Sequence, residues 1–273
     1  MSLLERTKSL LRSHRILPKK LLGQNFMIQP SIFESMADNA SLNRSDAVLD
    51  VGAGMGFLTR FTADKCRTVL AVEADLELVR VLREQLVHVS NVKIIEGDIL
   101  EAEVPPFNKV LSIPPYQISS RLLLWLFNRD FDCAVLVLQK EFANRLVAPV
   151  GHENYGWLTV LTYYYSEVEL LDDIPRSMFY PQPGIDSIIV RLRPRKTRPF
   201  SLRNEAQFKQ LLQSLFTQRN RKVRSAALPY LTGARHIERK NAAKTAGVLP
   251  FSERRVRELA PEEFGVLVNA ITK

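Results

Sequence analysis

Short apolar runs alternate with longer segments of helical periodicity over the first half of the chain. Five runs rich in Val, Leu and Ile are predicted strands: 46–51, 67–73, 92–95, 109–112 and 133–138. Such runs are typical of parallel strands that helices cover on both faces. The segments before, between and after them are predicted helices: 30–40, 58–62, 75–87, 117–127 and 139–147. The pattern predicts an α/β fold built on a mostly parallel sheet.

The pattern changes after the fifth run. Residues 167–171 and 187–192 are predicted to form an antiparallel closing strand pair, and the basic, proline-flanked segment 194–199 is predicted to be a linker. Beyond it, apolar residues recur three and four positions apart from Phe208 to Phe216, as in an amphipathic helix. We therefore predict two domains, 1–194 with the sheet and a small helical domain at 195–273.

Three glycines follow the first strand directly and precede a helix. Gly52, Gly54 and Gly56 allow positive φ and let a ligand approach the backbone. A dinucleotide-binding turn has the spacing G-x-G-x-x-G, and here Phe57 stands where its last glycine would be. With Asp50 just ahead, the G-x-G-x-G spacing favours a smaller, neutral or cationic ligand such as S-adenosylmethionine. A tight turn that binds nothing is the alternative.

Carboxylates follow the next two strands at the same edge of the predicted sheet. Glu73 ends the second strand, 21 residues after Gly52, an offset at which an acid can bind ribose hydroxyls. Asp98 follows the third strand, where it can accept a hydrogen bond from an adenine amino group. Ligands of open α/β sheets bind at the carboxyl ends of the strands. These ends therefore predict an S-adenosylmethionine pocket.

The fourth strand ends abruptly at Ile113, Pro114, Pro115 and Tyr116. The two prolines remove two backbone donors and leave carbonyls free, and Tyr116 can stack on a planar base. Carbonyls that accept the N–H groups of an adenine would localise the amino lone pair and aim it at a methyl carbon. Neither a metal nor a covalent intermediate is needed.

A second aromatic position is predicted to help hold an unstacked base. Phe179 opens the rigid segment 179–183, Phe-Tyr-Pro-Gln-Pro. Stacking on Tyr116 and Phe179 would offset the free energy of unstacking a base from an RNA helix. A plain proline turn is the other interpretation of this segment.

Charge is distributed unevenly along the chain, whose net charge is +9. Residues 24–194 hold 15 basic and 22 acidic residues, whereas residues 195–273 hold 17 basic and 6 acidic ones. Residues 1–23, predicted to include a loosely held helix within 1–20, hold six basic residues and one acidic residue. Basic ends around an acidic centre favour contact with a nucleic acid or another polyanion. Solvated basic tails are the alternative.

Two cysteines and the hydropathy pattern bear on the cellular compartment. Cys66 and Cys133 lie far apart in apolar segments, without metal-ligand spacing, as buried free thiols do. The N-terminus lacks the apolar block of a signal peptide, and no apolar run approaches the ~20 residues of a membrane span. We expect a cytoplasmic protein that does not contact a membrane.

Five segments carry a resemblance to a known family: Gly23 to Met27, Asp50 to Gly56, Gly97 to Ile99, Gln139 to Ala143, and Phe179 to Pro183 with Ser187. From about Leu21 to Lys273, the chain resembles the small-subunit ribosomal RNA adenine dimethyltransferases, most closely archaeal members. The resemblance implies a Rossmann-like fold and dimethylation of two adjacent adenosines in the 3′-terminal hairpin of small-subunit (16S) rRNA. It also implies S-adenosylmethionine as cofactor, S-adenosylhomocysteine as product, and a pre-30S subunit as partner of a monomeric enzyme that acts in ribosome biogenesis.

The same resemblance gives the expected site residues. Residues expected to contact the cofactor are Gln24, Asn25, Met27, Gly52, Gly54, Glu73, Ala74, Asp98, Ile99 and Ile113. Residues expected on the acceptor side are Ile113, Pro114, Pro115, Tyr116 and Phe179. A basic helix beginning within 218–224 is expected to bind RNA through Arg219, Arg221, Lys222 and Arg224. No metal site is expected.

One departure from the family leaves alternatives open. The family's acceptor motif is N-[LI]-P-Y, and Ile113 stands where its asparagine belongs. Either the Pro114 carbonyl, with or without Ser112, holds the adenine amino group in a slower or differently tuned enzyme, or the chain binds RNA and cofactor but methylates poorly. A non-catalytic ribosome-assembly factor, a large-subunit rRNA methyltransferase and a small-molecule methyltransferase are the other functions considered.

Overall fold

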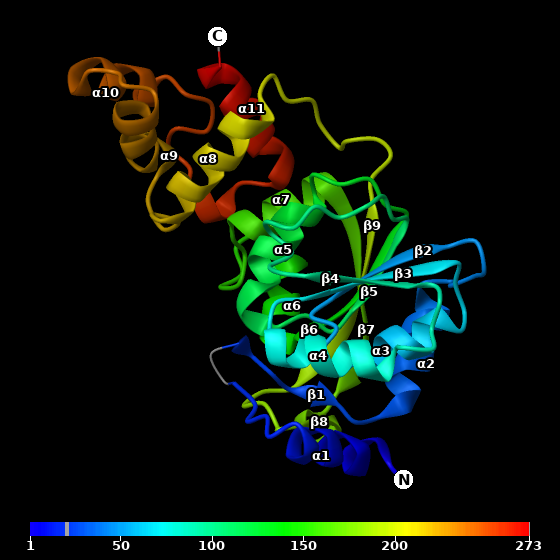
Figure 1. Ribbon diagram of the computed structural model, residues 1–273. Helices are drawn as coiled ribbons and strands as arrows, with labels where there is room; N and C mark the ends of the chain where they lie inside the picture. The colour runs from blue at the N-terminus through cyan, green and yellow to red at the C-terminus, as the bar shows by residue number, and fades with distance from the viewer. Residues whose placement is uncertain (20–21, 273) are drawn as a thin grey trace. The chain divides into compact units, whose positions relative to one another are not determined.

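The computed structural model describes residues 1–19 and 22–272 (Figure 1). Lys20 and Leu21, in the predicted N-terminal segment and at the start of the family resemblance, and Lys273 at its end lie outside the described residues. The chain divides into two compact units. The first holds residues 1–143 and 168–194, and the second holds residues 144–167 together with the chain from 195 onward. Residues 144–167 thus group with the C-terminal helices, which the linear boundaries 1–194 and 195–273 did not anticipate.

A seven-stranded sheet organises the first unit. Its strands, in spatial order, are β4 (Val92–Glu96), β3 (Thr68–Glu73), β2 (Ala47–Val51), β5 (Lys109–Ser112), β6 (Cys133–Gln139), β9 (Ser187–Pro194) and β7 (Ser166–Ile174). The neighbours from β4 to β6 are parallel, and β9 is antiparallel to β6. The predicted α/β class and the closing antiparallel strand are confirmed.

Strand order creates a crevice at the centre of this sheet. The chain goes from β2 to β3 on one side, and returns later to place β5 on the other side of β2. At such a switch point, the connections that leave the two carboxyl ends diverge. The glycine turn follows β2, and the proline–tyrosine turn follows β5. The fold therefore brings the two predicted halves of the site together.

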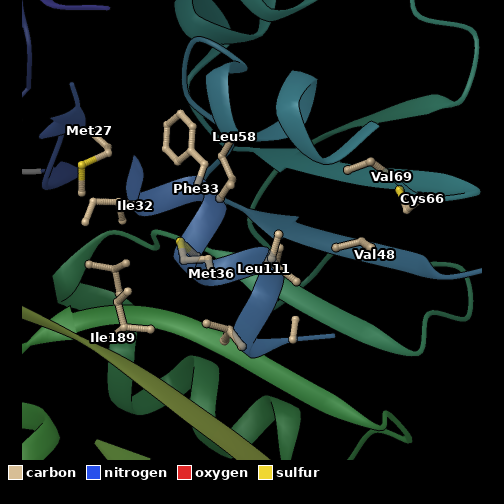
Figure 2. Close-up of a cluster of buried hydrophobic side chains, with 14 of the residues drawn as sticks. Met27, Ile32, Phe33, Met36, Val48, Leu58, Cys66, Val69, Leu111 and Ile189 are labelled. Atoms are coloured by element: carbon tan, nitrogen blue, oxygen red, sulfur yellow. The ribbon is translucent and has the colours of Figure 1, made fainter. Parts of the chain in front are cut away.

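Helices on the sheet bury the apolar positions that predicted them. Helix α2 (Pro30–Asn39) buries Ile32, Phe33, Met36 and Ala37, and α3 (Phe57–Ala63) follows the glycine turn. Figure 2 shows side chains of α2, β2, β3, β5 and β9 meeting in one apolar cluster. Helix α4 (Leu76–Gln85) packs on β3 and β4. The glycine turn thus leaves a rigid, buried strand and enters a packed helix.

The N-terminal segment is packed rather than loosely held. Helix α1 (Leu3–Ser13) begins with a capping box between Ser2 and Glu5. Leu11 and Ile16 are buried in a cluster that includes residues of α4. The strands β1 (Phe26–Met27) and β8 (Phe179–Tyr180) pair antiparallel in a small sheet beside α1 (Figure 1). The sequence did not predict this sheet, because two-residue strands carry no periodicity.

The connection after β5 differs slightly from the predicted helix 117–127. A single 3₁₀ turn, η2 (Tyr116–Ile118), precedes α5 (Ser119–Leu126). The helix is capped at Ile118 without a side-chain hydrogen bond. Helix α6 (Lys140–Leu146) follows β6 as predicted.

The second unit is helical. Its helices are α7 (Trp157–Tyr165), α8 (Glu205–Phe216), α9 (Val223–Ala226), the π-helical turn η4 (Tyr230–Ala234), α10 (Arg239–Gly247), η5 (Val256–Glu258) and α11 (Pro261–Ile271). Phe208 and Phe264 are fully buried between them. None of the helices in the described chain is long and apolar enough to span a membrane.

Candidate functional site

A cavity of about 280 Å³ lies at the carboxyl ends of β2, β3, β4 and β5. Every residue predicted to contact the cofactor lines it: Gln24, Asn25, Met27, Gly52, Gly54, Glu73, Ala74, Asp98, Ile99 and Ile113. Its wall also includes Pro114, Pro115 and Tyr116 from the predicted acceptor side. The structure therefore brings two segments from separate strand ends into one space.

The backbone of the first turn requires glycine, and at Gly52 and Gly56 a side chain would also collide with different neighbours. All have positive φ, of 73° at Gly52, 58° at Gly54 and 83° at Gly56. A Cβ at Gly52 would lie 2.7 Å from Cδ of Pro115, and one at Gly56 would lie 2.6 Å from a methyl group of Leu82. Gly52 thus allows the acceptor turn to approach, and Gly56 allows α4 to pack.

The Glu73 carboxylate fixes the glycine turn. One oxygen accepts the N–H of Gly54 at 2.8 Å, and the other accepts the N–H of Asp75 at 2.9 Å. Burial raises the pKa of Glu73, and these backbone donors oppose the increase. Each carboxylate oxygen keeps a second lone pair, so the group can still accept ligand hydroxyls.

Asp50, which the sequence marked only as an acid ahead of the glycines, is a buried group of this cavity. Its side chain is 1% exposed and accepts a hydrogen bond from the Thr59 hydroxyl at 2.7 Å. Burial raises the pKa of Asp50 to about 7, with a smaller contribution from the nearby Glu73 charge, and the Thr59 hydrogen bond opposes the rise. The signal available in the sequence was an acid inside an otherwise apolar strand.

Gln24 contributes through a network that the sequence did not reveal. Its amide donates to Asp75 at 2.6 Å, and its carbonyl accepts the N–H of Lys19 at 2.7 Å. The Lys19 ammonium lies 2.9 Å from Asp75 and 2.6 Å from Glu77. Burial of Asp75 opposes ionisation, but hydrogen bonds from Lys19 and Gln24 hold its pKa below the usual value. The network fastens the chain around Gln24 to the N-terminus of α4.

The acceptor turn is anchored at both ends. The Ser112 hydroxyl donates to the Val51 carbonyl at 2.7 Å and accepts the Val51 N–H at 3.3 Å, so it joins β2 to β5. Ser112 is fully buried by these contacts and does not line the cavity, so the expectation that it assists Pro114 is wrong. At the other end, the Tyr116 hydroxyl lies 2.6 Å from the hydroxyl of Ser187. Burial raises the pKa of Tyr116, which keeps the phenol protonated.

Phe179 is not on the cavity wall. Its side chain is 3% exposed and belongs to the apolar cluster of Figure 2. The reason is its pairing: Phe179 stands opposite Met27 in the β1–β8 sheet, and both side chains are buried. In this arrangement, Tyr116 is the aromatic residue of the predicted pair that lines the cavity.

The four basic residues expected to bind RNA do not share one helix. Residues 217–220 form a turn, and α9 begins at Val223, within the predicted range, so Arg224 is the one of the four that lies in the helix. The Arg219 guanidinium donates to the carbonyls of His152, at 2.7 Å, and Glu153. Within the same unit, Lys222 and Arg224 pair with one carboxylate, that of Glu253, at 2.7 and 2.8 Å.

Comparisons with known proteins agree on one family. A family model described as ribosomal RNA adenine dimethylase matches residues 17–272. The probable ribosomal RNA small subunit methyltransferase A of Thermococcus onnurineus is 38% identical over 261 residues, which cover 95% of this chain and 94% of that protein. The protein of the same description from Methanosarcina acetivorans is 36% identical over 250 residues, 91% of each chain.

Two solved structures are similar over most of the chain. A dimethyladenosine transferase from Plasmodium falciparum superposes with a TM-score of 0.75 at 26% identity, over 89% of this chain and 95% of that one. The 23S rRNA methyltransferase ErmE superposes with a TM-score of 0.65 at 29% identity, over 91% and 100% of the two chains.

Proposed function

Because the chain belongs to the ribosomal RNA adenine dimethylase family, we propose that it dimethylates adenosines of small-subunit rRNA with S-adenosylmethionine as methyl donor. The observation that carries the proposal is the single cavity shared by the glycine turn, Glu73 and Asp98 on one side and the Pro114–Tyr116 turn on the other. A methyl donor and an acceptor base can meet only if both fit into one space.

The residues of the cofactor half fit S-adenosylmethionine. The cavity wall includes the carboxylates of Asp50, Glu73, Asp75 and Asp98, which suit a ligand with net positive charge. Glu73 would hold the ribose hydroxyls, and Asp98 would accept from the adenine amino group. When bound, the cofactor supplies an electrophilic methyl group.

The acceptor half suits an adenine amino group. Pro114 and Pro115 have no N–H, so the backbone at these two positions can only accept hydrogen bonds. The hydrogen bond to Ser187 restricts the orientation of the Tyr116 ring, against which the base would stack. Ile113 lines the cavity with no polar atom on its side chain, so the carbonyls of this turn are the acceptors that would aim the amino group.

The finer features of the function follow from the family resemblance. The acceptors would be two adjacent adenosines of the 3′-terminal hairpin, in a pre-30S subunit, and the enzyme would act as a monomer in the cytoplasm. The domain at 195–273, with its excess of basic residues, would bind RNA, and the domain at 1–194 would carry the catalytic site.

Methylation of isolated, unmodified small subunits tests the proposal. The purified protein is incubated with subunits and labelled S-adenosylmethionine, and the digested rRNA is analysed for monomethyl- and dimethyladenosine by mass spectrometry. We expect dimethyladenosine in small-subunit rRNA and none in large-subunit rRNA treated in parallel. Binding to the subunit without any methylated adenosine would instead support a non-catalytic assembly factor. Label in large-subunit rRNA would support a large-subunit rRNA methyltransferase.

A further inference from the structure

Arg121 is a positive side chain in a cavity wall whose other charged residues are acidic. Of the described residues that line the cavity, it is the only Lys, Arg or His, whereas four lining residues are Asp or Glu. It lies in the first turn of α5, five residues after Tyr116. The cation is thus on the acceptor side of the cavity.

The guanidinium is available for a ligand. The Arg121 side chain is exposed to solvent and has no hydrogen bond or ion pair with any other residue of 1–19 and 22–272. Some arginines of this unit have partners, as Arg83 does with Glu96 at 3.1 Å and Arg191 with Glu169, whereas the side chains of others, such as Arg67, have none among the described residues. An exposed, unpaired arginine at a cavity edge contributes little to the stability of the fold. Its position therefore points to a role in binding.

We propose that Arg121 binds a phosphate group of the RNA strand next to the adenosine that enters the cavity, and so positions the substrate. This inference rests on the proposed function. A base that has entered the cavity leaves its sugar and phosphates at the mouth, because they are charged and joined to the rest of the strand. A phosphate approaching this wall meets the charges of buried or partly buried carboxylates, and Arg121 offsets their repulsion.

The chemistry of arginine suits this task. Its planar guanidinium can donate two parallel hydrogen bonds to phosphate oxygens, which fixes orientation as well as charge. Arg121 does not contact the reacting amino group in this proposal, so it is a positioning residue rather than a catalytic one. The competing ligand is the carboxylate of the cofactor, and the experiment must separate the two.

The test compares Arg121→Ala and Arg121→Lys with wild type and with Arg67→Ala. Arg67 is also an exposed arginine and precedes β3, at the end of the strand opposite the cavity, so its removal changes the net charge by the same amount. We measure kcat and KM for the small subunit at several salt concentrations, and the Kd of S-adenosylmethionine by calorimetry.

For Arg121→Ala we expect the KM for RNA to increase by roughly fivefold at moderate salt, and the slope of log KM against log salt to fall by about 0.7, as for one lost phosphate contact. Arg121→Lys should recover most of the slope, and Arg67→Ala should match wild type. The Kd of the cofactor should stay unchanged in every variant.

Three results would overturn the proposal. A weaker cofactor affinity in Arg121→Ala would assign the guanidinium to the cofactor carboxylate. An unchanged KM and salt slope in Arg121→Ala would show that Arg121 does not contact RNA. An equal increase in KM in Arg67→Ala would show that the effect is nonspecific electrostatics. Failure of the proposed function is distinct, because wild type itself would then produce no methylated adenosine.

Discussion

At the scale of single residues, the acceptor half of the site is defined by what position 113 lacks. Ile113 lines the cavity and also packs against the apolar cluster, so its side chain fills space without accepting a hydrogen bond. We expect Ile113→Asn to raise the rate of methyl transfer by about tenfold, since a fixed acceptor near the reacting amino group contributes at least this much in other sites.

The measurement is the single-turnover rate with saturating RNA and cofactor. Ile113→Val, which shortens the side chain without adding a polar atom, is the matched control and should not exceed the wild-type rate. Because asparagine packs poorly against an apolar cluster, the Tm of Ile113→Asn should decrease by a few degrees. A rate that falls in Ile113→Asn while cofactor binding stays intact would show that this position does not limit transfer.

We expect Asp50 to make cofactor affinity depend on pH. With a pKa of about 7, this carboxyl is mostly protonated at pH 6 and mostly ionised at pH 8. A cationic cofactor binds better beside the ionised form, so the Kd should decrease as pH rises from 6 to 8, by up to about tenfold. Calorimetric titration of wild type and Asp50→Asn measures this, and the variant should lose the part of the pH dependence that belongs to Asp50.

The same group has the opposite effect on the stability of the cofactor-free protein. Folding raises the pKa of Asp50 from about 3.9 to about 7, so between these values the folded state holds more protons than the unfolded state. The free energy of unfolding should therefore fall as pH increases from about 4 to about 7. Equal slopes of Tm against pH in wild type and Asp50→Asn would contradict the raised pKa.

At the scale of elements, the acceptor turn depends on a contact with a distant strand. The turn after β5 carries Tyr116, whose hydroxyl lies 2.6 Å from the hydroxyl of Ser187. Ser187 is the first residue of β9 and is fully buried. We expect Ser187→Ala to lower kcat by about three- to tenfold, because a lost neutral hydrogen bond is worth roughly 1 kcal/mol and the ring gains freedom.

Cofactor affinity separates this effect from general damage. Ser187→Ala and Tyr116→Phe should each leave the Kd of S-adenosylmethionine unchanged, since neither hydroxyl belongs to the predicted cofactor half. The two substitutions remove the same hydrogen bond, so the double variant should lose no more kcat than the single ones. Additive losses, or a weakened cofactor affinity, would show that the hydroxyls act separately.

The elements also show what the sequence could and could not predict. The strands carry continuous apolar runs, so their ends, and with them Glu73 and Asp98, were placed within one or two residues. Phe179 looked like an exposed platform because prolines follow it, yet pairing with β1 buries it. Such pairing brings together residues far apart in the chain, and no local pattern encodes it.

At the scale of the whole molecule, charge differs between the stretch that lines the cavity and the C-terminal stretch. The acidic stretch at 24–194 includes nearly all of the cavity wall, and the stretch at 195–273 carries 11 more basic than acidic residues. RNA affinity should therefore depend steeply on salt, while cofactor affinity depends on it weakly. The distribution was readable from the sequence, but the partners of individual basic residues were not.

Those partners determine how the predicted RNA-binding residues should respond to substitution. The Arg221 side chain is exposed and has no hydrogen bond or ion pair within the described part of the chain, whereas the Arg219 side chain is held by two backbone carbonyls. Arg221→Ala should weaken RNA binding, lower the salt slope by about 0.7, and leave the Tm unchanged.

Arg219→Ala should lower the Tm by several degrees, because two carbonyls lose charged donors worth roughly 1–3 kcal/mol. Lys222→Ala is the intermediate case, since Glu253 keeps Arg224. Filter binding to the small subunit and thermal melts of the three variants measure both effects. If Arg219→Ala lost RNA affinity at an unchanged Tm, and Arg221→Ala lost none, the assignment of these two arginines would have to be exchanged.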